Sequence, residues 1–120
     1  MKVETYQTQA MSTRMDTCDN LIYMLGLLHE EAGELQGKIN KAQRKGLLRA
    51  EDNHWVWKGT HEELHAFRDE CLKELGDVCW ACAGIAEEMS AELADVMQGN
   101  LDKLKSRKER GVIEGNGDNR

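Results

Sequence analysis

Two long stretches with apolar residues at every third or fourth position constrain the fold most. The first extends from about Asp16 or Thr17 to Lys45, with apolar residues at Leu21, Leu25, Leu28, Ala32, Leu35 and Ile39. The second begins at Thr60, with apolar residues at Leu64, Phe67, Cys71, Leu75, Val78, Cys82, Ile85 and Met89. This spacing places apolar side chains on one face of a helix. No proline interrupts either stretch, so the sequence predicts two amphipathic helices.

The ends of these helices carry residues that favour helix termini. Gly46 follows a basic last turn and predicts the end of the first helix. Thr60 and Glu63 have the spacing of a capping box, which predicts the start of the second. The segment between them, from Gly46 to Gly59, breaks the apolar pattern. We expect it to form a connecting loop.

Two shorter helices are expected, from about Thr5 to Met15 and from a Ser90 cap to Gly111, followed by a flexible tail at about 112–120. A length of 120 residues fits one domain, spanning residues 1–120. These helices alone make an incomplete bundle. We therefore expect an all-α fold with a four-helix core completed by homo-oligomerisation, as a homodimer or a dimer of dimers.

Composition narrows the classes of partner. The net charge of −6 argues against a general nucleic-acid binder, and no apolar run is long enough for a membrane helix. A cytoplasmic protein is the expectation. Residues 100–111 are basic despite the acidic total, through Lys103, Lys105, Arg107, Lys108 and Arg110. Such a segment suits a small anionic ligand, although a solvated helix face explains the charge equally simply.

Two pairs of carboxylates lie beside the apolar stripes. Glu31 and Glu34 share one helix face, and Glu74 and Asp77 repeat that spacing on the second helix. Carboxylates near a core repel one another and lose hydration, and a divalent cation relieves both costs. An all-oxygen ligand set favours magnesium, manganese or calcium over zinc. The alternative is that all four are boundary residues with exposed carboxyl groups.

Other side chains have two interpretations each. Lys38 continues the face of Glu31 and Glu34 and could receive phosphates, or it could pair with acids on the helix surface. Trp55 and Trp57 could stack on a nucleobase or pack against the bundle.

The chain resembles the MazG-like all-α nucleotide pyrophosphohydrolases from about residue 6 to residue 120. YQTQA at 6–10 looks like the family's N-terminal helix. GLLHEEAGEL at 26–35 and KELGDVCW at 73–80 look like its two metal motifs, and NLDKLKSRKERGVIEGNGDNR at 100–120 is similar to its C-terminal pattern. The connection between the metal motifs is longer than in compact members.

The resemblance implies a Mg²⁺-dependent hydrolase, with Mn²⁺ as a substitute, that converts an NTP or dNTP to the monophosphate and pyrophosphate by attack of an activated water. It implies that the metal ligands are Glu31, Glu34, Glu74 and Asp77. Glu30 or Glu31 would orient or deprotonate the water. The substrate contacts would include Asn100 and Lys103, with Arg107 as a weaker candidate.

Two other functions compete with this enzyme. A regulatory module would sense a nucleotide and turn it over poorly, and an intact set of four carboxylates with Lys103 argues against it. A helical interaction protein would bind no nucleotide, and would show no magnesium-dependent thermal shift with nucleotides.

Overall fold

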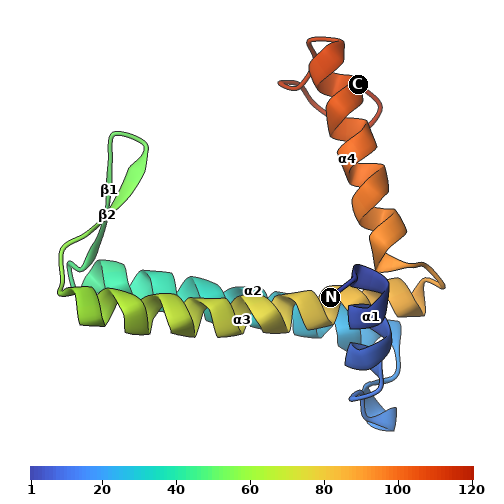
Figure 1. Ribbon diagram of the computed structural model, residues 1–120, viewed down its shortest axis with the longest axis horizontal. Helices are drawn as coiled ribbons and strands as arrows, with labels where there is room; N and C mark the ends of the chain where they lie inside the picture. Colours follow the sequence, from blue (N-terminus) through green and yellow to red (C-terminus); the bar gives the residue numbers. More distant parts are fainter.

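The computed structural model describes residues 1–120 and is mostly helical (Figure 1). Its helices are α1 (Val3–Met11), α2 (Leu21–Arg44), α3 (His61–Glu88) and α4 (Leu93–Glu109). A single two-stranded antiparallel sheet consists of β1 (Leu48–Glu51) and β2 (His54–Trp57). The all-α class is therefore confirmed, with one small hairpin added. None of the helices combines the length and apolar content that a membrane span requires.

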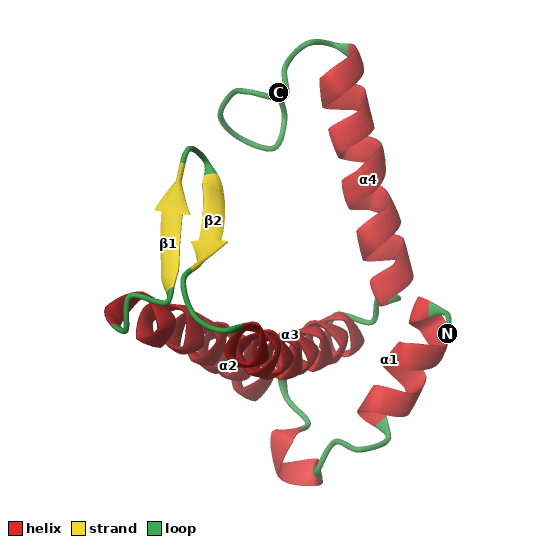
Figure 2. Cartoon of the chain, turned by 60° about the vertical axis from the view of Figure 1, so that its left-hand side comes forward, coloured by secondary structure: helices red, strands yellow, loops and turns green.

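Helices α2 and α3 lie side by side and form the body of the chain (Figures 1 and 2). The capping box at the start of α3 is confirmed, because Thr60 and Glu63 each accept the other's backbone N–H. The stop after α2 is also confirmed, with Gly46 at a φ of 71°. The start of α2 was predicted too early. Asn20 is its N-cap, and residues 16–18 form only a short 3₁₀ turn.

The prediction of a simple loop from Gly46 to Gly59 is wrong, because the segment contains the β-hairpin. Asp52 and Asn53 form its two-residue turn, with φ values of 49° and 64°. Positive φ at both central residues matches the right-handed twist of the flanking strands. At the base of the hairpin, Trp57 stacks on Phe67 of α3, with 4.9 Å between ring centroids. The hairpin is thereby fixed to the end of the α2–α3 pair.

The two shorter helices also differ from their predicted limits. Helix α1 begins and ends earlier than the predicted range from Thr5 to Met15. The residue preceding α4 is Glu92 and not Ser90, which has a left-handed φ of 54° in the linker after α3. Helix α4 projects from one end of the α2–α3 pair and the hairpin from the other (Figure 1). The chain is therefore open between these two arms.

The core of one chain is small. Only 11 of the 120 residues are buried, and the radius of gyration is 17.7 Å, against about 14 Å for a compact chain of this length. The largest fully buried side chain is Met24, which fills the space that a side chain at Gly84 would need. Large apolar side chains remain exposed on α2, α3 and α4, including Leu25, Leu72, Leu75, Val96, Met97, Leu101 and Leu104.

Candidate metal centre

Carboxylates from α2 and α3 converge near the middle of the pair. Glu31, Glu74 and Asp77 each offer one oxygen within 4.8 Å of the other two. Glu31 and Glu74 are half-buried, whereas Asp77 is exposed. Two oxygens bound to one cation lie at most about 4.2 Å apart for magnesium and about 5 Å apart for calcium, given their bond lengths. The spacing therefore suits a shared divalent cation after small side-chain adjustments.

The electrostatics of this cluster are unfavourable without a cation. Burial raises the pKa of Glu31, and the negative charges of Glu34 and Asp77 raise it further. The pKa of Glu34 is raised chiefly by the charge of Glu74 and by a hydrogen bond shared with it. Glu34 thus lies beside the three converging carboxylates. A bound cation would reverse these repulsions, and the all-oxygen donor set fits a hard ion.

Lys38, Glu30 and Tyr6 lie near the four acids. The Nζ atom of Lys38 lies 3.6 Å from a carboxylate oxygen of Glu74 and 3.7 Å from one of Glu70, so it partly neutralises the cluster. Glu30 is exposed, and its charge contributes to the raised pKa of Glu31. On α1, burial raises the pKa of Tyr6, with smaller contributions from Cys79 and from Asp77. Tyr6 is therefore close enough to Asp77 for that charge to act on its hydroxyl group.

Two of the predicted substrate contacts on α4, Lys103 and Arg107, bond the C-terminal tail within one chain. Lys103 Nζ lies 3.2 Å from Asp118 Oδ1, and Arg107 Nη2 donates to the same oxygen at 3.2 Å. Arg107 is only 5% exposed, and its Nε atom has no hydrogen-bond partner. Asn100 is exposed. Because α4 projects away from the α2–α3 pair, one chain does not bring these residues to the carboxylates (Figure 1).

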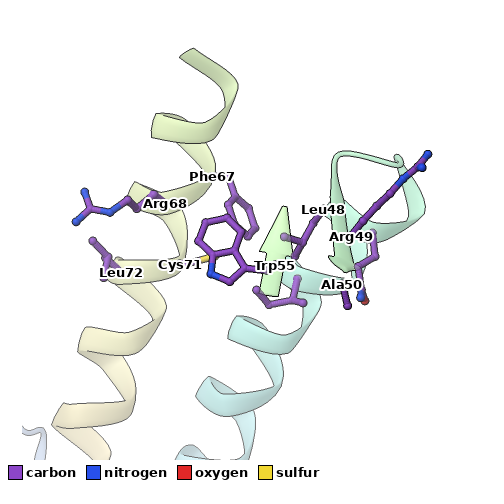
Figure 3. A pocket seen from close by; sticks show the side chains of 10 residues that line it. Leu48, Arg49, Ala50, Trp55, Phe67, Arg68, Cys71 and Leu72 are labelled. Carbon is purple, nitrogen blue, oxygen red and sulfur yellow. The ribbon is translucent and has the colours of Figure 1, made fainter. Parts of the chain in front are cut away.

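The two tryptophans lie at the hairpin end of the pair. The Trp57 indole N–H donates to the carbonyl oxygen of Thr60, while Trp55 is 63% exposed. Trp55 borders an apolar groove of about 460 Å³ between the hairpin and both long helices (Figure 3). Sequence patterns gave no sign of this groove, because it requires the unpredicted hairpin. A role for either tryptophan in binding a nucleobase stays a prediction.

Comparisons with known proteins agree with this arrangement. Residues 20–112 match the MazG nucleotide pyrophosphohydrolase domain, and this region includes both carboxylate pairs and all of α4. The chain is 38% identical to the Gene 37 protein of Mycobacterium phage L5, and the alignment covers 100% of both chains. No solved structure matches the chain. The matched domain covers well over half of the sequence, so this chain belongs to the MazG nucleotide pyrophosphohydrolase family.

Proposed function

We propose that this chain is a magnesium-dependent enzyme that hydrolyses a nucleoside triphosphate, ribo or deoxyribo, to the monophosphate and pyrophosphate. One observation carries the proposal. Glu31, Glu74 and Asp77 come from two separate helices, and their carboxylate oxygens meet within 4.8 Å. Membership of a nucleotide pyrophosphohydrolase family supplies the reaction class.

The acidic residues would hold the metal and accept a proton, and Glu31 is a candidate for both roles. Glu31, Glu34, Glu74 and Asp77 would hold magnesium, or manganese in its place. The bound ion would neutralise charge on phosphate oxygens and lower the pKa of water enough for attack near neutral pH. Glu30 or Glu31 would accept the proton of the attacking water.

The basic residues supply the phosphate side of the site. Lys38 is the cationic side chain beside the carboxylates, at 3.6 Å from Glu74, and would contact a phosphate bound there. Asn100, Lys103 and, more weakly, Arg107 would contact the remainder of the triphosphate. These α4 residues are displaced from the carboxylates within one chain (Figure 2). A complete site therefore needs a second copy of the chain.

The exposed apolar surface supports a homo-oligomer. Leu25, Leu72 and Leu75 are each at least 40% exposed on the α2–α3 pair. A single chain leaves this apolar surface in water at a free-energy cost. A second copy packed against it would complete a four-helix core and bring two α4 helices into one assembly. The apolar groove beside Trp55 lies partly on the same surface, through Leu72.

The test is a panel of NTPs and dNTPs with magnesium, in which pyrophosphate and orthophosphate are measured separately. Pyrophosphate is the expected first product. Glu34→Gln is expected to abolish its release while circular dichroism shows an unchanged helix content. Glu62→Gln, an exposed acid in the first turn of α3, is the control and should retain full activity. Orthophosphate as the first product, or full activity in Glu34→Gln, would contradict the proposal.

A further inference from the structure

A buried glutamine lies where α1 meets the corner between α3 and α4. Gln7 is 3% exposed, and its side-chain amide makes three hydrogen bonds. The amide nitrogen donates to a carboxylate oxygen of Glu87 and to the carbonyl of Ala91, both at 3.0 Å. The amide oxygen accepts the backbone N–H of Leu93 at 2.6 Å. Both amide protons and the amide oxygen are therefore engaged.

The backbone fixes the orientation of this amide. The N–H of Leu93 can only donate, so the group facing it must be the amide oxygen. Leu93 is the first residue of α4, and the side chain of the preceding Glu92 makes no capping bond. Gln7 thus satisfies a free N–H at the start of α4 from a different helix, which a local cap would ordinarily do.

The three partners of Gln7 belong to three successive segments. Glu87 is in the last turn of α3, Ala91 is in the linker, and Leu93 begins α4. A single buried side chain therefore holds both sides of the corner. Beyond this corner, α4 extends away from α1 and α3 (Figures 1 and 2).

The length of α4 amplifies any movement at this corner. At 1.5 Å per residue, Lys103 lies about 15 Å along the axis from Leu93, so a tilt of about 10° moves it by roughly 2.6 Å. A displacement of that size breaks a hydrogen bond to a phosphate oxygen. Asn100 moves by proportionately less.

We infer that Gln7 is a positioning residue that sets the direction of α4, and thereby the placement of Asn100 and Lys103 for the triphosphate. The inference rests on the proposed function, because it assumes that these two residues contact substrate. Gln7 itself touches no reacting atom. Its effect is on nucleotide binding and not on the carboxylate cluster.

Gln7→Glu tests this inference with a side chain of the same shape. It keeps the acceptor for Leu93, removes both donors, and places a second carboxylate against Glu87. We expect faster backbone hydrogen exchange across residues 89–96, and a KM for the nucleotide raised about tenfold, the effect of losing one phosphate contact. The kcat and the Mn²⁺ affinity should change less than about twofold, since a contact made equally in ground and transition states affects KM alone.

Two further variants separate positioning from general destabilisation. Arg14→Gln removes a neighbouring polar contact, because Arg14 bonds Glu88 at 2.7 Å but does not reach α4. It should leave the KM and the exchange at 89–96 unchanged. Gln7→Glu combined with Glu87→Gln restores a donor opposite the new carboxylate and should recover most of the KM.

The outcomes are distinguishable. Unchanged exchange at 89–96 in Gln7→Glu would overturn the inference, as would faster exchange with an unchanged KM. An equal rise of KM in Arg14→Gln would show only general destabilisation and would also overturn it. A wild-type protein without pyrophosphate release would remove the proposed function and the positioning role together. The exchange data would then still decide whether Gln7 holds the corner.

Discussion

Replacing Asp77 by asparagine should have opposite effects on stability with and without metal. Asp77 lies within 4.8 Å of both Glu31 and Glu74. At that distance each repulsion is about 0.9 kcal/mol in the dielectric of water. Asp77 is exposed, so salt and solvent screen both terms, and their sum is reduced to about 1 kcal/mol. Without metal, Asp77→Asn should therefore raise the free energy of unfolding by about 1 kcal/mol.

With metal bound, the wild type should be more stable than Asp77→Asn, which is the reverse of the metal-free order. An ion present at about 100 times its Kd stabilises the wild type by about 2.7 kcal/mol. For a domain of this size that raises the Tm by roughly 10 °C, whereas relief of repulsion in the metal-free variant raises it by only about 4 °C. Asp77→Asn loses a ligand and should gain little from the ion. Thermal unfolding in EDTA and in excess MgCl₂ measures both effects.

The control is Asp69→Asn, the same substitution at an exposed position of the same helix, outside the carboxylate cluster. The difference in Tm between Asp69→Asn and the wild type should be the same in EDTA and in magnesium. The reasoning would be refuted by an Asp77→Asn protein that is less stable than wild type in EDTA. A magnesium shift equal to that of the wild type would refute it equally.

Three other changes test separate parts of the structure. Gly84→Ala should cost about 1–3 kcal/mol in thermal unfolding, because its new methyl group would lie 2.1 Å from the buried Met24 methyl. The tail should be equally protected from proteolysis from about pH 7 to pH 5 and less protected below about pH 4. Its Asp118 has a pKa lowered by its bonds to basic residues of α4, so the attachment persists above the ordinary pKa and is lost as pH falls through the lowered one. Leu75→Lys should dissociate the proposed oligomer in light scattering.

Each of these predictions has its own control. Gly99→Ala has nothing within 4 Å of the added carbon and should be neutral or stabilising. Asp118→Asn should reduce the protection of the tail at pH 7 and remove its pH dependence, because only the bonds from Arg107 and Arg110 to tail carbonyls remain. A tail that remained as protected as in the wild type would contradict the ion-pair explanation. Lys73→Ala, an exposed change two residues from Leu75, should leave the assembly intact. A wild-type protein that is already monomeric would contradict the proposed second copy.

Local chemistry explains which parts of the fold were predictable. The start of α3 depends on Thr60 and Glu63, which are three residues apart, and the end of α2 depends on one glycine. Both signals are contained in a few neighbouring residues and were interpreted correctly. The hairpin was missed although Asp52 and Asn53 separate two strand-like runs. Its turn carries no glycine, and the usual sequence signal of a two-residue hairpin is Asn-Gly or Asp-Gly.

The candidate site was likewise predictable only where it depends on neighbouring residues. Spacing along each helix placed Glu31 beside Glu34, and Glu74 beside Asp77. Their convergence also depends on the register between α2 and α3, which neither helix specifies alone. The three bonds of Gln7 could not be predicted, because its partners lie more than 75 residues further along the chain. Apolar periodicity located the helix faces but did not distinguish a face buried in one chain from one left exposed.

The contact between Met24 and Gly84 has a consequence for the kinetics of folding. The hairpin joins the C-terminal end of α2 to the N-terminal end of α3. Contacts between the two helices at that end therefore close the shortest loops between them and cost the least entropy. Met24 and Gly84 lie near the opposite ends of those helices, so their contact closes a much longer loop. Their packing should form after the transition state, so weakening it should speed unfolding and leave the folding rate nearly unchanged.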